Sequence, residues 1–80
     1  MIEFIVYSRF GCHLCEDLLQ QLTLLQQKHD FSITEVDVDS SPQLIDQYGS
    51  QVPVVTCGGE QICHYFLDQA AILQVLKNNE

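Results

Sequence analysis

The sequence predicts one α/β domain over residues 1–80, in which a four-stranded mixed sheet is flanked by helices. Two observations support this fold class. Near the N-terminus a strand pattern, a leucine-striped helix and a second strand pattern follow one another, and such a unit pairs its strands in parallel through a right-handed crossover. Further along, a Gly-Gly turn joins two strand patterns, which favours antiparallel pairing. One sheet must therefore contain both kinds of pairing, in the order βαβ-α-ββα.

The first half of the chain supplies the strand–helix–strand unit. Residues 2–7 are β-branched and aromatic, as in a buried strand. A helix is predicted over about residues 13–28, because leucines recur there at helical spacing with polar residues on the opposite side. That stripe consists of Leu14, Leu18, Leu22 and Leu25. Residues 31–38 interleave polar and apolar side chains, which indicates a second strand.

A short helix is predicted next. Ser41 and Pro42 are typical of a helix start, with serine as the capping residue and proline at the first helical position. Gly49 suits the left-handed residue that often ends a helix. This helix connects the parallel unit to the second half of the chain.

The second half of the chain supplies the hairpin and a last helix. Residues 52–57 and 61–66 are the two predicted strands, with a tight turn at residues 58–59 between them. Asp68 can cap the final helix. The apolar stripe of that helix is Ile72, Leu73 and Leu76.

Composition limits the function classes. The formal charge is −8, from 11 acidic and 3 basic residues, so the surface repels nucleic acid and anionic membranes and favours partners with a basic patch. The apolar N-terminus lacks signal-peptide anatomy, because Glu3 interrupts it and no cationic region precedes it. No stretch reaches the ~20 apolar residues of a membrane span. We therefore expect a cytoplasmic monomer, in which cysteines serve catalysis or metal binding rather than a disulfide framework.

The pair Cys12 and Cys15 lies where the first strand passes into the leucine-striped helix. Unpaired N–H groups and the positive end of the helix dipole point to that position, so a thiolate at Cys12 is stabilised. Arg9 and a protonated His13 add positive charge. Acidic residues that follow at positions 16–17 oppose it, so we expect a moderate lowering of the Cys12 pKa.

Cys15 is expected one helical turn further in, on the same side as Cys12 and less exposed. Cys12 would then be the attacking thiol and Cys15 the thiol that resolves a mixed disulfide. Cys57 and Cys63 flank the Gly-Gly turn, where simple hairpin registers do not place them opposite each other. We therefore expect no disulfide between them, and buried cysteine behaves as a small apolar residue.

A metal site is the first alternative. Zinc sites usually present two tight cysteine pairs, and the five-residue gap between Cys57 and Cys63 fits that pattern poorly. The pair Cys12 and Cys15 could still hold metal, or an iron–sulfur cluster across a dimer. A second alternative is a non-catalytic module that binds partners. No residue is assigned as a metal ligand.

The chain resembles the thioredoxin superfamily, and within it the glutaredoxins and small bacterial glutaredoxin-like proteins. The resemblance covers nearly the whole chain and rests on four segments: Y-S-R-F-G-C-H-L-C, V-D-V-D-S-S-P-Q-L-I-D-Q-Y-G, Q-V-P-V-V, and the Gly-Gly hairpin with a final helix. It implies a thioredoxin-like (glutaredoxin-like) fold, a cis peptide bond before Pro53, and a Val52 backbone free to pair with an extended substrate. Arg9 occupies the position of a lysine that helps to hold glutathione in the family.

The chain also departs from the glutaredoxin pattern. His13 and Leu14 replace the proline and tyrosine between the cysteines, and Gln51 replaces a threonine. Cys63 and His64 stand where glutaredoxins carry two glycines that approach glutathione closely. We therefore expect no tightly bound cofactor, with glutathione as a candidate co-substrate.

Together the residues and the resemblance predict a thiol–disulfide oxidoreductase that uses the C-H-L-C dithiol. Its substrate would be a disulfide-containing protein or a glutathionylated molecule. Reducing equivalents would come from glutathione or a dedicated reductase.

Overall fold

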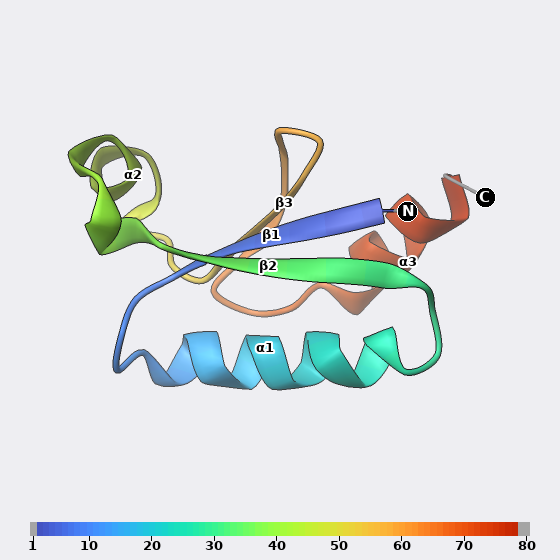
Figure 1. Ribbon diagram of the computed structural model, residues 1–80. Helices are drawn as coiled ribbons and strands as arrows, with labels where there is room; N and C mark the ends of the chain where they lie inside the picture. Colours follow the sequence, from blue (N-terminus) through green and yellow to red (C-terminus); the bar gives the residue numbers. More distant parts are fainter. Residues whose placement is uncertain (1, 79–80) are drawn as a thin grey trace.

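The computed structural model describes residues 2–78, and within them one four-stranded mixed sheet is combined with helices (Figure 1). In chain order the elements are β1 (Ile2–Ser8), α1 (His13–Gln26), β2 (Phe31–Asp37), a short 3-10 helix η1 (Val38–Ser40), α2 (Pro42–Tyr48), β3 (Val54–Cys57), β4 (Glu60–His64) and α3 (Gln69–Asn78). The predicted order βαβ-α-ββα is confirmed.

The sheet has the strand order β2-β1-β3-β4. β1 pairs in parallel with β2 over their whole length, and antiparallel with β3. The Gly58-Gly59 turn, in which both residues have a positive φ, returns the chain so that β3 and β4 pair antiparallel. The mixed pairing follows from the crossover through α1 and the tight hairpin, as the sequence predicted.

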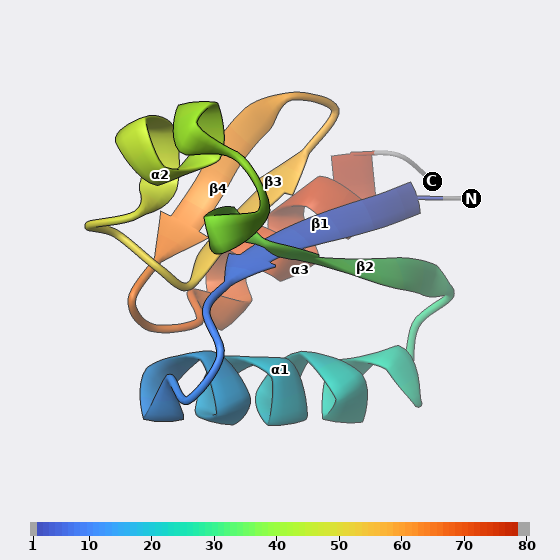
Figure 2. The same cartoon turned by 60° about the vertical axis from the view of Figure 1, so that its left-hand side comes forward.

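Two apolar clusters lie on opposite faces of the sheet. On one face α1 and α3 cover the sheet (Figures 1 and 2), and their buried side chains form one cluster with alternate residues of β1. That cluster is Phe4, Val6, Leu18, Leu22, Leu25, Phe31, Val55, Ile72 and Leu76. On the other face Val38, Tyr48 and Val54 form a smaller cluster, against which the ring of Tyr7 stacks on that of Tyr48. The alternation of β1 side chains therefore divides the core between the two faces.

Several boundaries differ from the sequence-based expectation. β3 begins at Val54 rather than at residue 52, and the cis Val52–Pro53 bond lies directly before it. β4 ends at His64 instead of residue 66, since Tyr65 adopts a left-handed conformation with φ 64°. The expected caps are partly confirmed: Asp68 accepts a hydrogen bond from the Ala71 N–H at 3.1 Å, whereas Ser41 is an N-cap residue without a side-chain cap bond.

The predicted role of Gly49 is wrong. Gly49 ends α2, but it remains in the right-handed region with φ −56°. A Cβ atom at this position would lie 2.5 Å from the carbonyl oxygen of Ile45. Close approach of the backbone, and not a positive φ, therefore explains the glycine.

Within residues 2–78, no helix has the length and apolar character needed to cross a membrane.

Candidate thiol–disulfide site

Cys12 is the N-cap residue of α1, and its sulfur takes part directly in the cap. The Cys12 backbone is extended, and its Sγ accepts a hydrogen bond from the Cys15 N–H with an N···S distance of 3.2 Å. That N–H is one of the four donors that the first turn of a helix leaves without an intrahelical partner. A negative charge on this sulfur would therefore be stabilised by a hydrogen bond and by the helix dipole together.

Cys12 and Cys15 are joined by a disulfide, and their Cα atoms lie 5.2 Å apart. The geometry is set locally. Gly11, with φ 77°, turns the chain so that the Cys12 N–H donates to the Arg9 carbonyl at 3.2 Å. The chain then enters α1 with Cys12 and Cys15 one turn apart. The disulfide ring therefore spans the N-cap and the first turn of α1.

The two cysteines differ in accessibility. Cys12 is half-buried, whereas Cys15 is only 2% exposed. His13, next to Cys12, is exposed, and its Nδ1 lies 3.8 Å from Oε2 of Glu16. Reagents from solution therefore reach Cys12 before Cys15.

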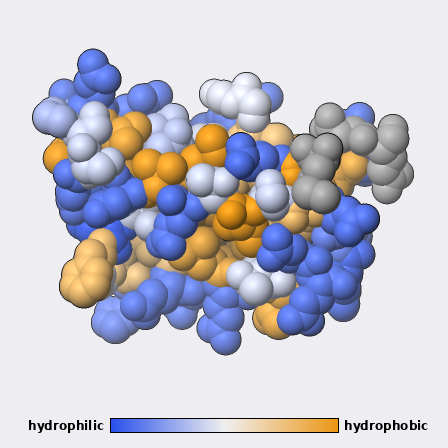
Figure 3. Space-filling model, viewed as in Figure 1, coloured by the Kyte–Doolittle hydropathy of each residue, from blue (hydrophilic) through white to orange (hydrophobic). Residues whose placement is uncertain are grey.

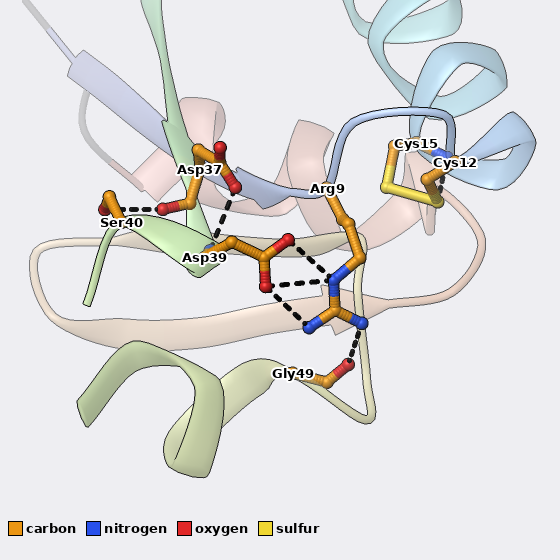
Figure 4. A network of polar contacts seen from close by, with 7 residues as sticks. All are labelled: Arg9, Cys12, Cys15, Asp37, Asp39, Ser40 and Gly49. Atoms are coloured by element: carbon orange, nitrogen blue, oxygen red, sulfur yellow. Dashed lines mark hydrogen bonds and ion pairs between the residues drawn. A yellow bond between two sulfur atoms is a disulfide. The ribbon is translucent and has the colours of Figure 1, made fainter. Parts of the chain in front are cut away.

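Arg9 is held by a carboxylate and a backbone carbonyl (Figure 4). Its Nε and Nη2 donate to the Asp39 carboxylate at 3.1 to 3.3 Å, and its Nη1 donates to the Gly49 carbonyl at 3.2 Å. Figure 4 shows the guanidinium directed to these acceptors and away from the disulfide. Arg9 was expected to add positive charge beside Cys12, but Asp39 compensates that charge. Arg9 instead connects the loop before Cys12 to η1 through Asp39 and to the end of α2 through Gly49.

Loss of the Arg9 contacts with Asp39 and Gly49 should lower the stability of the fold moderately. We expect Arg9→Ala to reduce the free energy of unfolding by about 1 kcal/mol, the upper part of the range for partly exposed ion pairs, because the contact is two-pronged. Arg9→Lys should recover only part of the loss, since an ammonium group cannot bind both carboxylate oxygens in the same way. Urea unfolding measures both. The exposed Lys28 provides the control. An equal loss of stability in Lys28→Ala would contradict a stabilising role of the Arg9 contacts.

The Val52–Pro53 peptide bond is cis, as the resemblance implied. The pairing of Tyr7 with Val54 places this bond beside the end of β1, and Figures 1 and 2 show the loop before β3 at the same end of the sheet as the β1–α1 loop. Within residues 2–78, the backbone N–H and C=O of Val52 make no hydrogen bond. Both groups are thus available to an extended segment from another molecule.

Tyr65 makes two hydrogen bonds to the loop that contains the cis Pro53. Its N–H donates to the Pro53 carbonyl at 2.9 Å, and its hydroxyl donates to the Ser50 carbonyl at 2.8 Å. Cys63 and His64, which were aligned with the two glycines of glutaredoxins, are the last two residues of β4. The left-handed backbone occurs at Tyr65, where a non-glycine residue is uncommon.

The remaining cysteines are free thiols, as expected. Cys57 is paired with Glu60 across the hairpin, and Cys63 is paired with Val55. The hairpin register therefore keeps the two thiols apart. Among residues 2–78, no group of three or more histidine, cysteine, aspartate or glutamate side chains is arranged to hold a metal ion.

Burial raises the pKa of the Cys63 thiol above its ordinary value; the Asp68 N–H lowers it in part, and the Asp68 carboxylate raises it. We therefore expect iodoacetamide at pH 8 to label Cys63 several-fold more slowly than a cysteine in an unstructured peptide. Because the folded state holds this proton more tightly, the contribution to stability is present below the pKa of the unfolded thiol and is lost as the pH rises through the higher pKa of the folded state. Labelling at the peptide rate in the native state would contradict this description.

Two features of the site gave no usable signal in the sequence. Asp39 is one acidic residue among 11, and only the fold brings it to Arg9. Tyr65 is a poor candidate for a left-handed position by residue type. Phe10 did carry a signal, because it is an aromatic residue only two positions before Cys12. Its side chain is 98% exposed in the structure.

Comparison with known proteins places this geometry in context. Residues 3–77 match the family model described as Glutaredoxin-like domain (DUF836). The solution structure of protein Ne2328 from Nitrosomonas europaea is similar to the chain with a TM-score of 0.87 and 36% identity, covering 94% of this chain and 91% of that one. Protein Rv0508 of Mycobacterium tuberculosis is 28% identical over 67 residues, which cover 78% of this chain and 69% of that protein. Thioredoxin of Trichomonas vaginalis shares the fold, with a TM-score of 0.67, 20% identity and coverage of 99% and 79% of the two chains.

Proposed function

The chain belongs to the Glutaredoxin-like domain family, and on that premise we propose that it is a thiol–disulfide oxidoreductase whose reactive pair is Cys12 and Cys15. One observation carries the proposal. The half-buried Cys12 sulfur caps α1 and accepts the Cys15 N–H, while the Cys15 sulfur is buried beside it. This asymmetry suits one thiol for attack and the other for resolution.

The reaction proceeds in two exchanges. The Cys12 thiolate attacks one sulfur of the substrate disulfide, forms a mixed disulfide with it and releases the other sulfur as a thiolate. Cys15 then gives up its proton and attacks the Cys12 sulfur, which closes the Cys12–Cys15 disulfide and releases the second substrate thiolate. The substrate disulfide is reduced by two electrons, and the protein dithiol is oxidised by the same two. An external thiol or a reductase restores the dithiol.

The other site residues support these steps. The free Val52 backbone next to the cis Pro53 can pair with the substrate chain beside its disulfide. Arg9 positions the loop that carries Cys12, and the exposed His13 adds positive charge near Cys12 when it is protonated. Substrates would be disulfide-containing proteins or glutathionylated molecules, with glutathione or a reductase as electron donor. We place this activity in the cytoplasm, where such donors are available, and assign it to the monomer.

A trapping experiment tests the proposal. In Cys15→Ser the mixed disulfide cannot be resolved, so the variant should accumulate covalent, reductant-sensitive adducts with substrates from a cell extract. The matched control is Cys63→Ser, which retains the C-H-L-C pair and should accumulate none. Absence of adducts together with undiminished non-covalent binding of partners would favour the interaction module. Stoichiometric iron or zinc in anaerobically prepared protein, lost in Cys12→Ser, would favour the metal-binding alternative.

A further inference from the structure

We propose that the natural substrate is a disulfide in a basic, apolar segment of a partner protein, and that this segment docks on the apolar side chains around Cys12. The inference rests on the proposed function and specifies its substrate class. It follows from two independent features of the surface near Cys12, namely exposed aromatic side chains and a one-sided charge distribution.

The first feature is the exposure of large apolar side chains near the disulfide. Phe10 is 98% exposed and Phe66 is 70% exposed. Phe10 precedes Cys12 by two residues, and Leu14, also exposed, follows it by two. Figure 3 shows a face of mixed polarity, with an apolar group that protrudes at the end where β1 meets α1. Apolar groups held in solvent beside a reactive centre mark a surface for a partner.

A groove extends this surface from the C-H-L-C segment. It runs between the first turns of α1 and the connection from β4 to α3, and we call it the Leu14 groove. Its apolar lining is Leu14, Leu18, Tyr65, Phe66 and Leu67. Leu14 belongs to the disulfide ring, while Tyr65 is bonded to the cis-proline loop. The groove is therefore continuous with both parts of the proposed reaction site.

The second feature is the charge beside these side chains. Asp17 lines the Leu14 groove, and the cleft next to Phe10 is lined by Glu35 and Asp37. The cation in the Phe10 cleft, Arg9, is already bound by Asp39. Among the described residues the lysines are Lys28, which follows the end of α1, and Lys77, which lies in the last turn of α3.

Distance keeps Lys28 from compensating this charge. Lys28 lies beyond the 14 residues of α1, and at ~1.5 Å per residue it is roughly 20 Å from the start of the helix. That exceeds the Debye length of ~8 Å at physiological ionic strength. An incoming molecule thus meets a negative field around apolar contacts.

This field selects among disulfides. Oxidised glutathione carries more carboxylates than amino groups, so it is repelled, and a second copy of this chain, with a formal charge of −8, is repelled as well. A protein segment with lysine or arginine near its cystine, and apolar residues to fill the Leu14 groove, satisfies both features. Electrostatic attraction of this kind raises association rates by ~10- to 10³-fold at low salt.

The test compares disulfides that differ in charge. Reduced protein is mixed with two synthetic peptide disulfides of equal length and apolar content, one rich in lysine and arginine and one rich in aspartate and glutamate, and with the neutral 2-hydroxyethyl disulfide. Acid quenching, alkylation and mass spectrometry give the rate of Cys12–Cys15 oxidation. We expect the basic peptide to react at least ~10-fold faster than the acidic one at low salt, and the ratio to approach one near ~1 M salt.

Substitutions show which side chains cause the preference for the basic peptide. Asp17→Lys should lower the basic-to-acidic ratio, whereas Asp30→Lys, an exposed position after the end of α1, should not. Phe66→Ser should slow the reaction with the basic peptide several-fold, and Leu24→Ser, 57% exposed further along α1, should not. Equal rates for the two peptides, with the neutral disulfide still reacting, would overturn this inference and leave the proposed function intact. Failure of all three disulfides to react would overturn both.

Discussion

Cys12→Ser is expected to abolish disulfide exchange, lowering the rate to that of the reductant alone. A serine hydroxyl at the N-cap can still accept the Cys15 N–H, so the start of α1 is preserved. It cannot attack a disulfide, because only a thiolate does so at neutral pH. Reduction of 2-hydroxyethyl disulfide with an excess of dithiol reductant measures the loss.

The matched control for Cys12→Ser is Cys57→Ser. Cys57 is a free, partly buried thiol in the structure, and it lies in β3 outside the Cys12–Cys15 disulfide ring. It should retain the wild-type rate. If Cys12→Ser kept its activity, or if Cys57→Ser lost it at unchanged stability, the assignment of the reactive thiol would be wrong.

Leu22→Ala is expected to produce the largest loss of stability outside the site, about 2–5 kcal/mol. Leu22 is completely buried in the cluster that joins α1 to the sheet and α3. Truncation removes apolar area from the core and leaves a cavity that a closely packed interior fills only in part. A small domain with a total stability of roughly 5–15 kcal/mol would lose a large part of it. Denaturant unfolding followed by circular dichroism measures the change.

Leu24→Ala is the matched control, because it removes the same atoms from the same helix at a position that is 57% exposed. Its effect should stay within about 0.5 kcal/mol. Similar losses in both variants would mean that the face of α1 has been misassigned. The comparison bears on function as well, since the packing of this face holds the helix whose N-terminus carries Cys12.

The parts of the fold that local physics determines were predictable from the sequence. The leucine spacing in α1 predicted the buried face correctly for Leu18, Leu22 and Leu25, which are in the core, but not for Leu14, which is exposed. The Gly58-Gly59 turn required the antiparallel hairpin, and both glycines have a positive φ. The position of Cys12 at the start of α1 followed from the change from strand to helix pattern.

Features that depend on contacts between distant segments were not predictable. Arg9 was expected near the Cys12 sulfur, but residues 30 and 40 positions away, Asp39 and Gly49, bind its guanidinium. Tyr65 could not be identified as left-handed, because its conformation is held by bonds to Pro53 and Ser50. Gly49 was assigned a positive φ by residue type, whereas the backbone of Ile45 leaves no room for a side chain at this position. For Arg9 and Tyr65, tertiary contacts override a local preference, whereas the Gly49 contact lies within the last turn of α2.

The pKa of the Cys12 thiol tests the central claim most directly, because the account depends on a thiolate stabilised at the N-terminus of α1. It can be measured in the reduced protein from the pH dependence of Cys12 alkylation, with mass spectrometry to separate Cys12 from the other thiols. We predict a value below the ~8.5 of an ordinary cysteine. A value at or above ~8.5 would contradict the account.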